Sequence, residues 1–495
     1  MNTDHIISRN LCQRPFRFAG RAPMILWAFT VLVGCSDLLE ETPKTVVAEN
    51  FYQSAADIEA ATNAIYNPLR NVRSEQVAVL SAHTDWGYGR GSRAQYNDFD
   101  GLNATNINTA ASRWTMFYEG IRNANLVIFH VPQSEQVAQE VRDRFLGEAR
   151  FLRALTYFDL VRNWGGVPLR TEENMEERDV PKANADQVYA FILEDLRMAE
   201  RALPAEPAQP GRPTLWAAKT LMADVFLQLE AYDSAQVKAK EVIDSGQFGL
   251  VPVQRVEDIQ WKIFGPDLVN SSEEVFYLKY ARQSAQGNGL PWILNHPSTG
   301  LYNFGGAYAH YGDAANPFFE QWDDADLRKQ LWSNVDFGLG ATTLVSGKYV
   351  EPEAPDNTGA GNDLPIYRYA EVLLLFAEAD VRASGTVSGE ALEALNQVHR
   401  RGYGLDPSVP GEVDFGLSEM STEAFLDAVL QERAYEFQFE GKRWLDLKRL
   451  GRAEEFVSQN KGISIAEKHY LWPIPVDELN YNQAMDASSD QNPGY

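Results

Sequence analysis

The feature that most constrains this chain is a pair of amphipathic helical patterns, which occurs twice. In residues 212–246, small and large apolar residues recur at helical spacing on both sides of a turn at Tyr232. These positions are Ala217, Leu221, Ala223 and Phe226, then Ala235, Ala239 and Val242. A second pair covers residues 370–399, and such pairs with a period of about 34 residues are typical of tetratricopeptide repeats. Because one pair cannot bury its apolar face alone, the sequence predicts an all-α (mainly) scaffold of stacked helix pairs.

Four further segments carry the same helical periodicity. They are residues 55–72, 109–129, 135–161 and 184–203. We expect Pro68 to disturb the last turn of the first helix, and Gly165-Gly166 to end the third.

Residues 250–365 have a different character from the segments on either side. Gly, Asn, Pro and aromatic residues become frequent there, and residues 287–313 read as loop. A loop-rich insertion of this length is usually functional or disordered, and its aromatic content argues against disorder. The last 30 residues are a Pro-, Asn- and Asp-rich tail, which we expect to be tied down across the body.

The N-terminus has the composition of an export signal. Four arginines precede an apolar stretch at residues 22–33, which is too short to span a membrane. It ends in Leu32-Val33-Gly34-Cys35, which resembles the lipobox of bacterial lipoproteins, so we expect residues 1–34 to be removed and Cys35 to be acylated. The acidic stretch at 36–41 looks like a surface-export signal of Bacteroidota lipoproteins; a solvated tether is the alternative.

Charge and cysteine content exclude several classes of function. The net charge is −25, which repels nucleic acid and anionic lipid, so attachment to a membrane requires a covalent anchor. The only cysteines are Cys12 and Cys35, so residues 36–495 hold no disulfide, thiolate zinc site or cysteine nucleophile. We expect no cofactor. Asp356-Asn357 and Gly361-Asn362-Asp363 offer oxygen ligands that suit calcium, but their spacing is not that of an EF-hand, and an ordinary turn is favoured.

Six segments, in order along the chain, resemble the SusD/RagB family of outer-membrane nutrient-binding lipoproteins. They are Cys35 to Tyr52; Gly147-Glu148-Ala149-Arg150 with Tyr157-Phe158-Asp159; Trp164-Gly165-Gly166-Val167-Pro168; Arg368-Tyr369-Ala370-Glu371; Glu432-Arg433 through Arg443-Trp444 to Arg449; and Pro473-Ile474-Pro475 with Asn492-Pro493-Gly494-Tyr495. Each segment is short, but their common order makes the resemblance specific.

This resemblance implies a fold, a location and a partner. It implies one domain over residues 35–495, with helical repeats at about 50–246 and 366–450 and the loop-rich ligand-binding insertion at about 250–365 packed on one side. It also implies a lipid-anchored outer-membrane protein that faces the cell exterior. Such a protein would capture an oligosaccharide, or alternatively a peptide or another nutrient, for a SusC-like TonB-dependent β-barrel transporter, without breaking bonds.

The strongest charged constellation permits an enzymatic alternative. Glu432, Glu436 and Glu440 share one helical face, and glycoside hydrolysis requires two carboxylates that flank one bond. Nearby Arg and Lys would instead keep these carboxylates ionised, which is wrong for a general acid. An ion-pair lattice is therefore favoured over a glycoside hydrolase. A third class, a pure adaptor, would not need the aromatic loops.

Aromatic residues in loops are the candidate ligand site. Sugars present flat C–H faces on which Trp and Tyr rings stack, and neighbouring polar groups bind the hydroxyls. Loop aromatics are less easily explained as core than aromatics on helices, although core packing remains the alternative for each of them. The predicted ligand-binding residues are Trp86, Tyr88, Arg93, Trp292, Tyr302, Asn303, Tyr308 and Tyr311.

Overall fold

The computed structural model describes residues 51–97, 99, 110–416 and 420–495. Contacts divide the chain into residues 1–47 and 48–495, and the second unit contains all of the described core. The predicted export signal, the acylated Cys35 and the acidic stretch at 36–41 lie outside the described residues.

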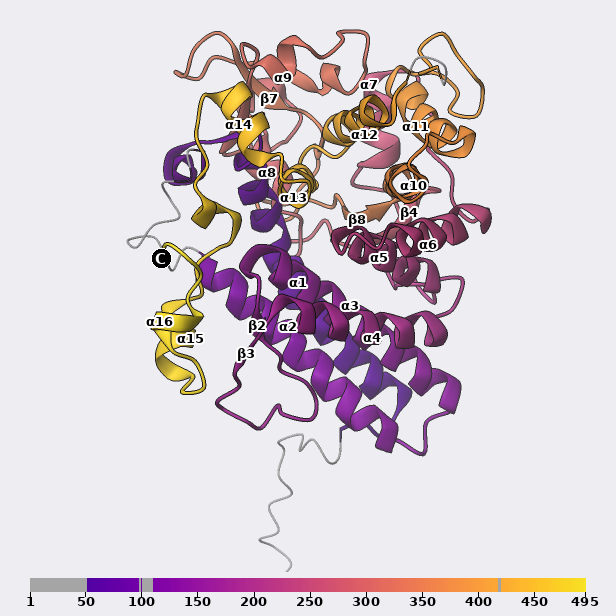
Figure 1. Cartoon of the computed structure of the whole chain (residues 1–495), viewed down its shortest axis with the longest axis vertical. Coiled ribbons are helices and arrows are strands. Elements are labelled where there is room, and N and C mark those ends of the chain that lie inside the picture. The colour runs from indigo at the N-terminus through magenta and orange to yellow at the C-terminus, as the bar shows by residue number, and fades with distance from the viewer. Residues whose placement is uncertain (1–50, 98, 100–109, 417–419) are drawn as a thin grey trace, which may run out of the picture. The chain divides into compact units, whose positions relative to one another are not determined.

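The second unit is built mainly of helices, as the sequence predicts. The longer ones are α1 (Ala55–Ala82), α2 (Ala111–His130), α3 (Gln139–Trp164), α4 (Ala185–Ala202), α5 (Leu215–Gln228), α6 (Tyr232–Asp244), α10 (Tyr369–Ser384), α11 (Gly389–Gly402), α12 (Thr422–Glu436), α13 (Arg443–Arg449) and α14 (Ala453–Lys461). From α1 to α6, each helix packs against the next, and α1–α4 lie side by side in Figure 1. The four segments predicted from periodicity are therefore confirmed as helices.

The first helix is longer than predicted, because Pro68 does not end it. Ser54 and Asp57 form a capping box at its start, and the helix continues through Pro68 to Ala82. Proline has no N–H to donate to the carbonyl of Ala64 one turn earlier. Asn123 on α2 donates its Nδ2–H to that carbonyl over 2.9 Å. A neighbouring helix thus satisfies the group that Pro68 leaves free, and the expected end at residue 72 is wrong.

The two predicted helix pairs are present as α5–α6 and α10–α11, and they stack on each other. Leu227 and Ala235 of the first pair form a buried cluster with Leu375 and Ala379 of α10. Small residues at this contact let the helices approach closely. The stack therefore joins segments that are separated by the whole loop-rich region.

Short strands and helical turns organise the loop-rich region. Strands β1 (Tyr88–Gly89), β5 (His310–Asp313), β7 (Thr343–Ser346) and β6 (Trp332–Asn334) form one antiparallel sheet in that order. Two smaller sheets pair β4 (Glu274–Leu278) with β8 (Leu364–Arg368), and β2 (Val167–Pro168) with β3 (Lys182–Ala183). The short helices of the loop-rich region are α7 (Val256–Asp258), α8 (Leu290–Leu294) and α9 (Pro317–Glu320). Two more short helices, α15 (Val476–Tyr481) and α16 (Ala487–Asp490), lie in the C-terminal tail.

The C-terminal tail is held against the end of α3. Trp164 donates its Nε1–H to the carbonyl of Pro473 over 3.0 Å, and the amide of Asn492 donates to the carbonyls of Trp164 and Trp472. The expectation of a tied tail is confirmed. In the ranges that the structure describes, we find no helix with both the length and the apolar character needed to cross a bilayer.

Candidate functional site

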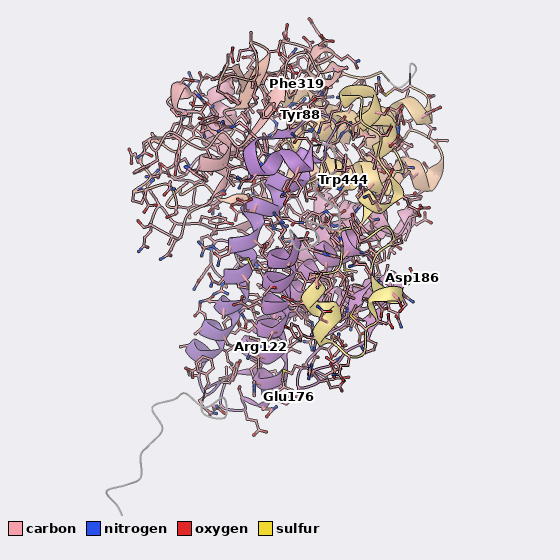
Figure 2. The ribbon with its side chains drawn as sticks, turned by 90° about the vertical axis from the view of Figure 1, so that its left-hand side faces the viewer. Tyr88, Arg122, Glu176, Asp186, Phe319 and Trp444 are labelled. Atoms are coloured by element: carbon pink, nitrogen blue, oxygen red, sulfur yellow. The ribbon has the colours of Figure 1, made fainter. Side chains whose placement is uncertain are left out.

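Strand pairing brings two of the predicted tyrosines together. Tyr88 in β1 lies opposite Tyr311 in β5, and their rings stack with centroids 5.4 Å apart. Both rings are half-buried, and burial raises the pKa of each phenol, so both stay protonated as hydrogen-bonding groups. Figure 2 shows Tyr88 near Phe319, at the end of the unit opposite to Arg122 and Glu176.

A tight loop places Tyr308 beside this pair. The N–H groups of Ala307, Tyr308 and Ala309 donate to carbonyls at residues 292–295, so the loop folds back onto α8. At Gly306 the backbone has φ +108, and a Cβ atom would lie 2.1 Å from the carbonyl oxygen of Asn295. Only glycine fits there. This close approach determines where the ring of Tyr308 lies.

Phe337 and His296 complete the group. Phe337 lies in the turn between β6 and β7, with its ring 5.0 Å from that of Tyr308 and 6.1 Å from that of Tyr311. The ring of His296 stacks on Phe337 at 5.7 Å and meets Tyr308 edge-on at 4.6 Å. All of these side chains are half-buried. We call Tyr88, Tyr308, Tyr311, Phe337 and His296 the aromatic cluster.

Cationic side chains border the aromatic cluster. The guanidinium of Arg90 lies 3.9 Å from the ring centroid of Tyr308 and donates to the carbonyl of Ala307 over 3.1 Å. The ammonium of Lys461 lies 4.6 Å from the ring centroid of Tyr88. The cluster therefore combines ring surface with hydrogen-bond donors, which is the composition of a small-ligand site.

Two other predicted residues near β1 have different roles. Trp86 is only 1% exposed, and its ring contacts those of Phe318, Trp332 and Phe439. The structure thus places Trp86 in the core and leaves its ring no face for a ligand. Arg93 is half-buried and forms an ion pair with Glu75, so its charge is already matched.

The remaining predicted residues form a second group, which packs against residues 354–360. Tyr302 is buried and donates its hydroxyl to the carbonyl of Asp356 over 3.0 Å. Asn303 is exposed, and its amide donates to the carbonyl of Ala354 over 2.8 Å. Trp292 is half-buried against Tyr302. Phe304, at 45% exposure, extends this group to the surface. Of the predicted set, the structure therefore gathers Tyr88, Tyr308 and Tyr311, and separates the others.

Two members of the aromatic cluster were absent from the predicted set. His296 and Phe337 lie in Gly-, Asn- and Pro-rich stretches, where the chain has no periodicity. The one available signal for Phe337 was an aromatic residue in the glycine-rich segment Asp336-Phe337-Gly338-Leu339-Gly340. That signal does not indicate which other loop its ring would meet.

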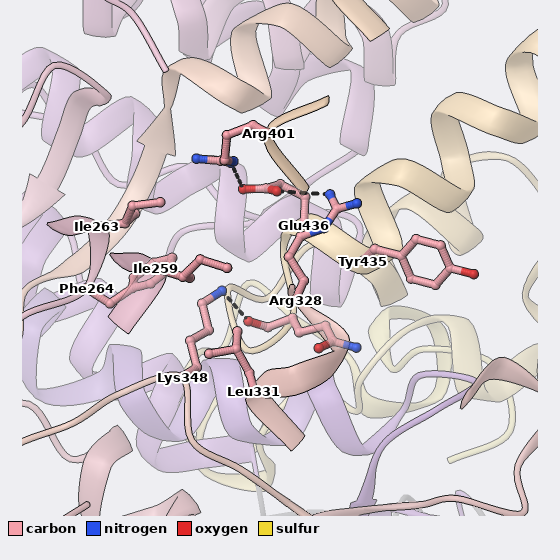
Figure 3. A pocket seen from close by; sticks show the side chains of 10 residues that line it. Ile259, Ile263, Phe264, Arg328, Leu331, Lys348, Arg401, Tyr435 and Glu436 are labelled. Atoms are coloured by element: carbon pink, nitrogen blue, oxygen red, sulfur yellow. Dashed lines mark hydrogen bonds and ion pairs between the residues drawn. The ribbon is translucent and has the colours of Figure 1, made fainter. Parts of the chain in front are cut away.

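The three carboxylates that suggested hydrolysis lie inside a buried ion-pair network. Arg328 lies 2.6 Å from Glu432 and 3.1 Å from Glu436, and Arg401 also pairs with Glu436, as Figure 3 shows for the last two contacts. Fully buried Arg368 contacts Glu436 at 2.8 Å and Glu440 at 2.9 Å. The favoured prediction of an ion-pair lattice is thus what the structure contains.

The electrostatics of this network do not suit acid catalysis. Burial by itself would raise the pKa of Glu436, but Arg401, Arg368 and Arg328 hold it well below its usual range. The same balance lowers the pKa of Glu432 and of Glu440. The adjoining cavity has a volume of about 10 Å³, which is barely room for one water molecule. A sugar cannot reach these carboxylates.

The predicted calcium segment forms turns and ion pairs. Asp356 accepts hydrogen bonds from the N–H and hydroxyl of Thr358, both over 2.7 Å, and Asp363 pairs with Lys279 at 2.9 Å. Within residues 51–97, 99, 110–416 and 420–495, no group of three or more His, Cys, Asp or Glu side chains could hold a metal ion. An ordinary turn was the favoured prediction, and Asp356 forms one.

The stacked helix pairs, the aromatic cluster on short strands and loops, and the burial of Glu432, Glu436 and Glu440 in an ion-pair network together define a helical-repeat ligand-binding protein. Two family models match the chain: one described as "SusD family" over residues 322–495, and one described as "Starch-binding associating with outer membrane" over residues 37–227. The chain belongs to the SusD/RagB family. Proteins of this family bind ligands without catalysis, so the chain is a binding protein and not an enzyme. The second description associates its members with the outer membrane.

Relatives cover almost the whole chain. SusD-like protein P2 of Formosa agariphila is 27% identical, over 94% of this chain and 97% of its own length. A crystal structure of a SusD homologue from Bacteroides thetaiotaomicron superposes with a TM-score of 0.78 at 22% identity, over 92% of this chain and all of that one. Surface glycan-binding protein A of the same organism, solved with laminarihexaose, gives 0.72 at 22% identity, over 89% of this chain and 100% of that one. These solved structures show the same fold.

Proposed function

We propose that this chain is a cell-surface lipoprotein that captures an oligosaccharide at the aromatic cluster and delivers it to a SusC-like TonB-dependent transporter. The observation that carries the proposal is the gathering of Tyr88, Tyr308, Tyr311 and Phe337, half-exposed, from three separate parts of the chain. A core would bury these rings, whereas here each keeps part of its surface open.

The chemistry of the aromatic cluster suits a sugar. The C–H faces and edges of a pyranose ring pack on aromatic rings, and its hydroxyls need donors and acceptors around them. The phenols of Tyr88 and Tyr311 and the free donors of Arg90 can supply these. Trp292, Asn303 and exposed Phe304 would extend the surface for a longer chain of sugars. Trp86 and Tyr302 are buried, so in this proposal they stabilise the surrounding fold and do not contact the sugar.

Relatives point to the same ligand class. One solved relative is described as a laminarin-binding SusD-like protein, and another holds laminarihexaose. The starch-binding protein SusD of Bacteroides thetaiotaomicron is 29% identical over 27% of this chain. In our proposal, residues 35–495 form a single domain, acylated Cys35 anchors it in the outer membrane facing the exterior, and the transporter receives the ligand.

Isothermal titration calorimetry of the protein that begins at residue 36 tests this proposal. That form keeps the entire unit 48–495, which contains the described core. Titration against plant, algal and host oligosaccharides should give micromolar binding, and Tyr311→Ala should weaken it by about tenfold or more. Tyr481→Ala is the matched control, because this tyrosine is 66% exposed and lies outside the aromatic cluster.

Three results would contradict the proposal in different ways. Binding of peptides instead of oligosaccharides would select the alternative nutrient class. Oligosaccharide binding that is unchanged by Tyr311→Ala would move the site away from the aromatic cluster. Failure to recover a β-barrel with the protein from native membranes would argue against the transporter partner.

A further inference from the structure

Arg90 is a cation with spare donors at the edge of the aromatic cluster. Its guanidinium lies 3.9 Å from the Tyr308 ring centroid and 5.4 Å from that of Phe337. One of its N–H groups donates to the carbonyl of Ala307. Across the described part of the chain, no carboxylate lies within 4.0 Å of its nitrogens. A guanidinium has five N–H donors, so most of those on Arg90 remain available.

Several buried arginines in this protein are neutralised by carboxylates. Arg443 pairs with Asp85 at 2.7 Å, and Arg449 pairs with Glu378 at 2.7 Å. The chain has 69 acidic residues against 44 basic ones, so carboxylate partners are plentiful. Arg90 is instead oriented by a ring and a carbonyl, which fix its position but leave its charge uncompensated.

His296 supplies a second group that can only donate. Its Nδ1 accepts hydrogen bonds from the N–H of Ser298 over 3.1 Å and from the Ser298 hydroxyl over 2.7 Å. A nitrogen that accepts from a backbone N–H carries no proton, so the neutral ring holds its proton on Nε2. Burial and the nearby charge of Arg90 lower the pKa of His296, which keeps the ring neutral. In the described ranges, Nε2–H has no hydrogen-bond partner.

Arg90 and His296 both contact Tyr308 and Phe337, so their donors border one part of the aromatic cluster. At the other end of the cluster, Asp313 contributes to raising the pKa of both Tyr88 and Tyr311, after burial. A ligand group that meets two donors and a full positive charge is best bound if it is an anionic acceptor. Guanidinium groups bind carboxylate and sulfate-like oxyanions through paired hydrogen bonds.

We infer that the aromatic cluster selects sugars with an anionic substituent, a uronate carboxylate or a sulfate ester, whose oxygens bind Arg90 and His296. This inference rests on the proposed function and specifies its substrate class. The net charge of −25 does not oppose it at contact distance. At physiological salt, charges more than about 8 Å apart are largely screened, whereas a contact of about 3 Å is not.

A glycan microarray with neutral, uronate-containing and sulfated oligosaccharides tests the inference. Calorimetry on matched pairs follows, with oligogalacturonate against its methyl ester and a sulfated galactan oligosaccharide against its desulfated form. We expect the acidic member of at least one pair to bind about tenfold or more tightly than its neutral counterpart. The pair that shows this preference identifies the anion as carboxylate or sulfate.

Arg90→Gln should weaken binding of the acidic member about tenfold more than that of the neutral one, which abolishes the preference, and Arg90→Lys should restore it only in part. Arg70→Gln is the matched control, because Arg70 also lies over a ring, that of Tyr280, and donates to a carbonyl, that of Gln286. Urea unfolding of each variant verifies the fold.

The possible outcomes separate the two proposals. Equal binding of acidic and neutral members, or a preference that persists in Arg90→Gln, overturns the inference and leaves the oligosaccharide-binding proposal intact if Tyr311→Ala still weakens binding. Absence of binding to every carbohydrate overturns both.

Discussion

The buried side chain of His310 should make the folded protein less stable as the pH falls. His310 lies in β5, next to Tyr311 of the aromatic cluster, and is 1% exposed. Neither of its ring nitrogens has a hydrogen-bond partner in the part of the chain that the structure describes. Burial, and then the charges of Arg93 and Lys461, lower its pKa to about 3. The folded protein therefore holds this ring neutral.

The sign and size of the effect follow from linkage. In the unfolded chain the pKa of histidine is about 6.5, so between pH 6.5 and 3 the unfolded state binds a proton that the folded state does not. The stabilising contribution of His310 is complete above pH 6.5 and declines as the pH falls below that value. Between pH 7.5 and 5.0 the loss is about 2 kcal/mol, at about 1.4 kcal/mol per pH unit.

The assay is urea unfolding of wild type and His310→Leu at pH 7.5 and 5.0, followed by tryptophan fluorescence. Leucine leaves a packing defect that costs the same at both pH values, so comparing the two pH-dependent losses isolates the titration. Wild type should lose about 2 kcal/mol more than the variant between these pH values. Equal losses would refute the reasoning and show that His310 is protonated, or hydrated, in the folded state.

Two further predictions rest on specific contacts, and a third rests on the sequence around Cys35. Arg368→Ala removes one buried cation that pairs with Glu273, Glu436 and Glu440 and should lower the free energy of unfolding by about 3–5 kcal/mol, whereas Arg178→Ala at the surface should change it by less than about 1 kcal/mol; equal effects in urea unfolding would contradict this. Asn123→Ala removes the side-chain donor to the carbonyl opened by Pro68 and should cost about 0.5–1.5 kcal/mol in the same assay, since this hydrogen bond is exposed and water can replace the donor. Cys35→Ala should move the protein from the membrane fraction to the soluble one, and unchanged acyl labelling would disprove the lipid anchor.

The sequence by itself determined the helices and their pairing. Helical periodicity depends on neighbours three and four residues apart, so it can be read locally, and it correctly predicted the segments of α5–α6 and α10–α11. The order of the short motifs is also a property of the sequence alone, and it indicated the family. The extent of α1 could not be read this way, because it depends on Asn123, which lies on another helix and donates to the carbonyl that Pro68 leaves open.

The candidate site was only partly within reach of the sequence. Aromatic residues in loops indicated the regions from which the aromatic cluster is built, but the exposed area of a ring depends on contacts from distant parts of the chain. Trp86 is covered by rings from distant parts of the sequence, including that of Phe439, while Tyr88, two residues later, stays half-exposed. Strands as short as β1 have no detectable pattern, so only the folded chain shows that Tyr88 meets Tyr311.

The carboxylates of Glu432, Glu436 and Glu440 show the same division most clearly. Their spacing of four residues could be read from the sequence, and it is compatible with either an acid catalyst or an ion-pair network. The prediction that all three share one helical face is wrong for Glu440, because α12 ends at Glu436 and Glu440 lies in the turn that follows. Arginines from other segments, Arg328 and Arg368, decide between the two. The protonation of a carboxyl group depends on charges within a few ångströms, and only tertiary packing determines which charges those are.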